Sequence, residues 1–110
     1  MDTITYEDFV KVDMRVGTIT QAESVPKSKK LLKLSVFFGA ELGTRTILAG
    51  IAEAYNAEAI VGLQIVAVTN LPPREMMGIE SNGMLLAGWS ATGQLTLVSP
   101  NGIADGQRIG

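Results

Sequence analysis

The polar side chains best suited to binding a ligand are concentrated in one stretch, residues 70–84. Residues 63–69 before it form an apolar, β-branched run, and residues 84–89 after it are also apolar, which predicts two buried strands. Pro72 and Pro73 fix φ and remove amide donors, so the first strand must end there. We therefore expect a rigid loop with exposed hydrogen-bonding and soft apolar groups. The candidate side chains are Asn70, Arg74, Glu80, Ser81, Asn82 and the methionines, including Met84.

Arg74 is the strongest single candidate in this stretch, because its planar guanidinium suits a phosphate or the edge of a base. An ion pair with Glu75 or Glu80 is an equally open alternative. Ser81 can either contact a ligand or bond its own backbone in a turn. Asn70, at the end of a strand, can either contact a ligand or cap the loop.

Most catalytic chemistry is excluded by composition. The chain has no Cys and no His, which removes thiolate ligands, thiol nucleophiles and the commonest general base. No pair of carboxylates has the spacing of an acid–base site, and Gly-x-Ser-x-Gly is absent. The lysine-rich segment at residues 27–30 lacks the nucleotide-binding βαβ unit of a synthetase active site. We expect no enzyme activity, no metal and no cofactor.

Charge is distributed unevenly along the chain. The net charge is −2, yet residues 27–45 contain five basic residues and one acid, which leaves −6 for the remainder. Because screening limits electrostatic reach to about 8–10 Å, this local excess permits weak binding to phosphates. A solvated hairpin tip is the alternative reading of residues 26–30. The candidate phosphate contacts are Lys27, Lys29, Lys30 and Lys33.

The order of predicted elements indicates an all-β fold. Strands are expected at residues 13–25, 31–38, 44–51, 63–69 and 84–89, with a helix at 53–60 and further short strands at 95–98 and 107–109. Three strands, a helix and two strands is the order of the OB-fold, a five-stranded Greek-key barrel. Thr5 predicts the N-cap of a short N-terminal helix with an apolar face packed on the core. Residues 1–110 are expected to form one domain.

Two motifs resemble a known family. One comprises Asp8-Phe9 and Asp13-Met14-Arg15-Val16-Gly17. The other comprises Asn70, Pro73, Arg74, Gly78, Ser81, Gly83, Met84, Leu86 and Ala87. Together they resemble the tRNA-binding domain of bacterial methionyl-tRNA synthetase, which also occurs in free-standing tRNA-binding proteins and in the endothelial monocyte-activating polypeptide domain. Lys29 departs from the family, whose members commonly carry an acid there, and makes this loop more basic.

The resemblance implies tRNA as the partner, a role as accessory component of a methionyl-tRNA synthetase catalytic subunit, and a homodimer. Extra C-terminal strands help subunits pack in that family, so Trp89, Leu95 and Leu97 are candidate dimer contacts, with packing inside one subunit as the alternative. With no signal peptide and no apolar run long enough to span a membrane, we expect a cytoplasmic protein without a membrane partner.

A second branch of the family suggests another function, that of an export-related, dimeric chaperone that binds peptides. The acidic net charge and five methionines fit an adaptable peptide groove. Ser81-x-Gly83-Met84 favours the tRNA branch, and a purely structural dimerisation domain is a third option. With three Phe, two Tyr and one Trp, stacking on aromatics is not expected to be the main source of affinity. The position of the Lys27–Arg45 cluster relative to Arg74 and Ser81 discriminates between RNA and peptide.

Overall fold

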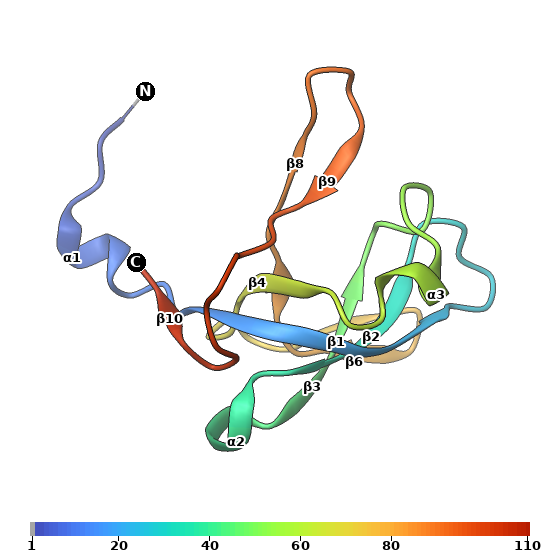
Figure 1. Cartoon of the computed structure of the whole chain (residues 1–110), viewed down its shortest axis with the longest axis horizontal. Coiled ribbons are helices and arrows are strands. Elements are labelled where there is room, and N and C mark those ends of the chain that lie inside the picture. The colour runs from blue at the N-terminus through green and yellow to red at the C-terminus, as the bar shows by residue number, and fades with distance from the viewer. Residues whose placement is uncertain (1) are drawn as a thin grey trace.

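The computed structural model describes residues 2–110, which form one curled sheet, two small hairpins and three short helices (Figure 1). The strands are β1 (Met14–Ser24), β2 (Leu32–Phe37), β3 (Thr44–Ala49), β4 (Gln64–Val68), β5 (Arg74–Met76), β6 (Ile79–Ser81), β7 (Met84–Leu85), β8 (Ala87–Trp89), β9 (Leu95–Leu97) and β10 (Arg108–Ile109). The helices are α1 (Tyr6–Phe9), α2 (Gly39–Leu42) and α3 (Ala57–Ile60). None of the helices in residues 2–110 has the length and apolar character that crossing a membrane requires.

The main sheet has the strand order β3-β2-β1-β4-β7, with β10 also paired to β1. All of its pairings are antiparallel. The amide of Asn82, just before β7, donates a hydrogen bond to the carbonyl of Thr46 in β3 (2.8 Å), which joins the two ends of the curled sheet. This arrangement matches the OB-fold order, so the predicted all-β, OB-like fold is confirmed.

The long strand β1 is central because it pairs with both β2 and β4. Its register against β2 shifts between Ile19 and Gln21, and this bulge lets one strand serve both sides of a curled sheet. The importance of Gly17 in β1 is steric. A Cβ atom there would lie 2.7 Å from Cγ1 of Val36 and 2.8 Å from Cδ1 of Phe38.

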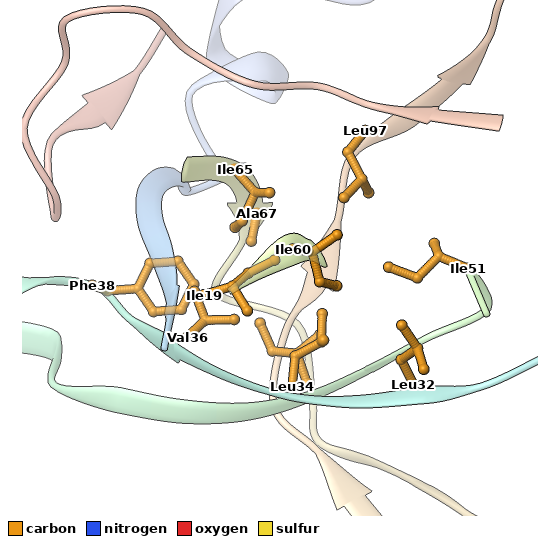
Figure 2. Close-up of a cluster of buried hydrophobic side chains, with 11 residues drawn as sticks. Ile19, Leu32, Leu34, Val36, Phe38, Ile51, Ile60, Ile65, Ala67 and Leu97 are labelled. Carbon is orange, nitrogen blue, oxygen red and sulfur yellow. The ribbon is translucent and has the colours of Figure 1, made fainter. Parts of the chain in front are cut away.

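The core fills the inside of the curled sheet. Figure 2 shows side chains from β1, β2, β4, α3 and β9 converging, with Ile60 of α3 inserted among them. Phe38 is only 1% exposed and is the largest fully buried side chain. The members of this cluster are Ile19, Leu32, Leu34, Val36, Phe38, Ile47, Ile51, Ile60, Ile65, Ala67 and Leu97. Inward alternation in β2, at Leu32, Leu34 and Val36, is the pattern expected for a strand with one buried face.

Several boundaries differ from the sequence prediction. The expected loop after β4 contains the β5–β6 hairpin, and the expected strand at residues 84–89 is divided into β7 and β8. The division arises at Leu86, whose amide bonds to the carbonyl of Val66 while its carbonyl accepts from Val98, so the chain turns out of the sheet. The helix expected at residues 53–60 is reduced to α3, and α2 was not predicted.

The N-terminal helix is capped as expected, but it does not pack on the core. The hydroxyl of Thr5 accepts a hydrogen bond from the amide of Asp8 (3.1 Å). No residue of α1 is buried, Tyr6 is 77% exposed, and Phe9 is not part of the core. Figure 1 shows the reason: the chain before β1 leads α1 away from the sheet. The expectation of a helix packed against the barrel is therefore wrong.

Candidate nucleic-acid interface

The centre of the predicted site is the β5–β6 hairpin. Arg74 is paired with Ser81, Glu75 with Glu80, and Met76 with Ile79. Its two turn residues, Met77 and Gly78, both have positive φ (53° and 77°), as the tight hairpin turn of type I′ requires. A defined turn of two residues sets the register, so the side chains of Arg74 and Ser81 lie on one face of the hairpin.

Ser81 attaches this hairpin to the main sheet. Its hydroxyl accepts a hydrogen bond from the amide of Leu48 in β3 (2.9 Å) and donates one to the carbonyl of Gly83 (3.3 Å). The residue is only 4% exposed. A direct contact between this hydroxyl and RNA would require these bonds to break. Ser81 therefore bonds to the backbone, as in the second alternative given above. One of its partners, however, is Leu48 in β3, which is distant in the sequence.

Arg74 lies beside a semi-enclosed pocket with a volume of about 240 Å³. The ion pairs formed within residues 2–110 involve Lys11, Arg15, Lys33 and Arg108, so Arg74 is not neutralised by Glu75 or Glu80. The two glutamates face each other on the opposite side of the hairpin. The pocket is lined by Leu48, Leu71, Pro72, Arg74, Met76, Ser81, Gly83 and Met84. It combines apolar walls with one free cation, which suits a planar, partly apolar group attached to an anion.

Three further predicted site residues, Asn70, Asn82 and Met84, lie in different environments. The side-chain amide of Asn70 accepts from the amide of Asp13 (2.9 Å) and donates to the carbonyl of Lys11 (2.6 Å), so it clamps the segment before β1 to the end of β4. Asn70 therefore fits the alternative in which its side chain caps backbone groups rather than contacts a ligand. Asn82 is half-buried at the barrel closure, and Met84 is 50% exposed at the rim of the pocket.

The basic residues divide into three environments. Lys27, Lys29 and Lys30 are exposed on the loop between β1 and β2, where the Ser28 hydroxyl accepts from the amides of Lys30 (3.4 Å) and Leu31 (3.1 Å). Lys27 has a φ of 68°, which is strained for a residue other than glycine. This loop therefore presents three charges on a backbone with a defined conformation.

Lys33 and Arg45 are less available than the sequence suggested. Lys33 forms an ion pair with Glu23 at 3.4 Å. Arg45 donates a hydrogen bond to the carbonyl of Thr69 (2.6 Å) and is only partly exposed. The positive field of residues 27–45 therefore derives mainly from the loop lysines.

The outer face of the main sheet connects the lysine-bearing side of β2 with the hairpin that carries Arg74. Lys33 in β2 is the register partner of Leu48 in β3, whose amide bonds to Ser81, the partner of Arg74. The strands β2, β3, β6 and β5 are consequently neighbours. A groove of about 470 Å³ runs along this face, lined by Thr20, Gln21, Ala22, Glu23, Lys33, Ser35, Thr46 and Val61. Of these groove residues, only Lys33 was a candidate from the sequence, although the polar alternation of Lys33 and Ser35 in β2 was a usable signal for the face itself.

The side chains of Asp13 and Arg15 have shifted pKa values and lie away from the pocket at Arg74. The carboxylate of Asp13 has its pKa lowered, first because it accepts a hydrogen bond from Arg15 (2.7 Å) and also because Arg15 and Arg108 are close. The pKa of Arg15 is raised by the same contact. Both residues lie at the junction of β1 and β10, and neither lines the pocket at Arg74.

Comparison with known proteins gives a consistent family. Residues 14–108 match the family model described as "Putative tRNA binding domain". The chain is 50% identical over 99 residues to a methionine–tRNA ligase of Methanococcoides burtonii and 45% identical over 109 residues to one of Porphyromonas gingivalis. These matches cover 90% and 98% of this chain but only 14% and 16% of the ligases.

Solved structures resemble the chain over almost its whole length. A MetRS-related protein of Pyrococcus horikoshii has a TM-score of 0.89 with 35% identity and 99% coverage of both chains. The chaperone CsaA of Bacillus anthracis has a TM-score of 0.87 with 37% identity, covering 99% of this chain and 100% of CsaA. The CsaA chaperone of Picrophilus torridus has a TM-score of 0.90 with 31% identity, covering 98% and 100%.

Proposed function

This chain belongs to the tRNA-binding domain family, and on that premise we propose that it is a non-catalytic module that supplies tRNA to a catalytic partner. The observation that carries the proposal is the position of Arg74, which is free of ion pairs within residues 2–110 and held on a hairpin beside the outer face of β2 and β3. In OB-folds, this face and its bordering loops bind oligonucleotides. The loop lysines 27, 29 and 30 would add contacts to the phosphate backbone.

The catalytic partner is inferred to be a methionyl-tRNA synthetase, either as the remainder of a longer chain or as a separate subunit. The chain spans 14–16% of the length of the first ligases it matches. The residues of this chain that match the family include the β5–β6 hairpin with Arg74. A tethered second site raises the local concentration of tRNA without contributing to the chemistry. This activity would take place in the cytoplasm, and residues 1–110 would act as one domain.

We further infer a homodimer, but through a different surface from the one the sequence suggested. Leu97 is buried in the core and Leu95 packs against it, so these two residues serve their own subunit. The N-terminal segment instead exposes large apolar side chains, namely Ile4, Tyr6, Phe9, Val10 and Val12. Sedimentation equilibrium of Tyr6→Ser/Val10→Ser is expected to show a monomer where the unmodified chain is a dimer. A dimer that survives this double change would contradict the assignment.

The experiment that tests tRNA binding is fluorescence anisotropy with labelled bulk tRNA at low and raised salt. Four or five neutralised phosphates would produce a log–log salt slope of about −3 to −4.5. Lys29→Ala/Lys30→Ala and Arg74→Ala are each expected to weaken binding. Lys11→Ala removes one positive charge from the segment after α1 and is the matched control for Arg74→Ala. No binding at low salt would overturn the proposal.

Peptide binding is the second candidate, favoured by the likeness to two CsaA chaperones. The apolar walls of the pocket at Leu48 and Met84 would accept a hydrophobic side chain. The same anisotropy assay with a labelled apolar peptide discriminates the two functions. Binding of peptide without binding of tRNA would place the chaperone function first.

A further inference from the structure

The β8–β9 hairpin carries the most exposed aromatic side chain outside the N-terminal segment. Figure 1 shows this hairpin extending well beyond the curled sheet. Trp89 is paired with Leu95 and Ala87 with Leu97, so these four side chains share one face of the hairpin. At the base of that face Leu97 enters the core, whereas further out Trp89 is 73% exposed. The face of the hairpin that packs on the core at Leu97 is therefore exposed to solvent further out, at Trp89.

The hairpin is held firmly at both ends. At its base, the amide of Leu97 donates a hydrogen bond to the hydroxyl of Tyr55 (3.0 Å), which lies just before α3. At its tip, the amide of Ser90 bonds to the carbonyl of Gln94 (2.8 Å), and the Ser90 hydroxyl accepts from the amide of Gln94 (3.0 Å). These bonds fix the position of Trp89 relative to the β3–α3 loop.

Between Trp89 and that loop lies a pocket of about 330 Å³. A Cβ atom added to Gly50 would meet nothing within 4 Å, so the pocket has open space at this position. The pocket has an aromatic wall, small apolar walls and two side chains able to bond to a ligand. It is lined by Gly50, Glu53, Ala54, Trp89, Gln94 and Leu95.

The basic loop lies next to this pocket. The amide of Ala52 donates a hydrogen bond to the carbonyl of Lys30 (2.9 Å), which joins the β3–α3 loop directly to the segment carrying Lys27, Lys29 and Lys30. The next strand on that side, β2, contributes Lys33 to the groove on the outer face of the sheet. The loop that carries these lysines therefore borders the loop that lines the pocket and leads into β2, which lines the groove, so its charges would complement a polyanion that spans both.

We propose that the pocket at Trp89 binds one unpaired base of the RNA, stacked on the indole ring, while the loop lysines contact the adjoining phosphates; this rests on the proposed tRNA-binding function. Unpaired bases of RNA are commonly stacked on aromatic side chains and read at their edges. The carboxylate of Glu53 repels a phosphate but accepts hydrogen bonds from an exocyclic amino group. The pocket would therefore prefer a base that carries such a group, such as cytosine, over uracil.

Trp89 is the only tryptophan in the chain, so its fluorescence reports on this pocket alone. The probes are tRNA, a single-stranded tetracytidylate and a single-stranded tetrauridylate. We expect all three to quench the emission, tetracytidylate at a lower concentration than tetrauridylate. Glu53→Gln is expected to reduce the difference between the two tetranucleotides. Equal quenching by both in the unmodified protein would overturn the role assigned to Glu53.

Affinity measurements on variants complete the test. Trp89→Ala is expected to weaken tRNA binding by about 5- to 100-fold, the usual effect of losing one stacked base. Gly50→Val fills the open space at a residue without positive φ and is expected to weaken binding while Trp89 remains in place. Thr96→Ala, on the opposite face of the same hairpin, is the matched control and is expected to have no effect.

The outcomes separate this inference from the proposed function. Binding of tRNA with unchanged Trp89 emission and unchanged affinity of Trp89→Ala would overturn the pocket and leave tRNA binding intact. Absence of tRNA binding in the unmodified protein would overturn both. If the emission maximum of Trp89 shifts when RNA-free protein is diluted, the occupant of the pocket is a second copy of the chain. If an apolar peptide quenches the emission and RNA does not, the occupant is a peptide. Either result would overturn the proposal.

Discussion

The hydroxyl of Ser81 accepts a hydrogen bond from the amide of Leu48, 33 residues earlier in the chain, at 2.9 Å. This contact joins the β5–β6 hairpin to β3 of the main sheet. Arg74, the register partner of Ser81, is thereby placed beside the same strand. The β5–β6 hairpin is thus positioned by a buried side-chain hydrogen bond, and the guanidinium of Arg74 that it carries is left available to a ligand.

Replacing Ser81 by Ala should destabilise the protein and, through the hairpin, weaken tRNA binding. The amide of Leu48 would lose its partner in a buried position, which costs about 1–3 kcal/mol. The free energy of unfolding in urea and hydrogen exchange at the Leu48 amide would measure the effect. Ser24→Ala, at an exposed position on β1, is the control. Unchanged exchange at Leu48 would contradict the structural role of Ser81.

Arg74 should contribute both charge and shape to RNA binding. Arg74→Ala is expected to weaken tRNA binding and reduce the magnitude of the log–log salt slope by about 0.7–0.9, the loss of one phosphate contact. Arg74→Lys should retain the slope but not the full affinity, because an ammonium lacks the planar fork. Glu75→Gln, on the opposite face of the hairpin, should not weaken binding. Equal affinities of the unmodified and Arg74→Ala proteins would exclude Arg74 from the interface.

Asp13 should make stability sensitive to acid. Its pKa in the folded state is lowered from 3.8, chiefly by the hydrogen bond from Arg15, so its carboxylate stabilises the fold above about pH 3.8. That contribution is lost as pH falls through the folded-state pKa. Asp13→Asn should therefore lower the urea midpoint at pH 7 and converge towards the unmodified protein below about pH 3.8. Asp8→Asn, in an exposed ion pair, should have little effect at any pH.

Gly17→Ala should destabilise the protein, although the backbone conformation at residue 17 is open to residues other than glycine. A Cβ atom would lie within 2.8 Å of Val36 and Phe38 side-chain atoms, and such overpacking costs about 1–3 kcal/mol. Gly88→Ala is the matched control, since a Cβ atom there meets nothing within 4 Å. Urea unfolding of both variants would measure the difference. Equal stability of the two variants would mean that β1 and β2 can move apart at little cost.

The sequence by itself determined the main strands, much of the core and the family. Alternation in β2 and the continuous apolar run of β4 depend on neighbouring residues only, so they can be read along the chain. The motif from Asn70 to Ala87 depends on residue identity alone and carried the recognition of a tRNA-binding domain. The absence of Cys and His likewise excluded whole classes of chemistry before any fold was known.

The tertiary structure alone decided which polar groups remain free. Ser81 and Asn70 match the family motif as well as Arg74 does, yet their partners lie 33 and 57 residues away, and Arg45 is bonded to the carbonyl of Thr69. Likewise, the pocket at Trp89 exists because β9 is anchored to Tyr55, 42 residues earlier. Local propensity acts over a few residues, whereas these contacts arise from sheet register and barrel closure. Only the folded chain brings such distant groups within hydrogen-bonding distance.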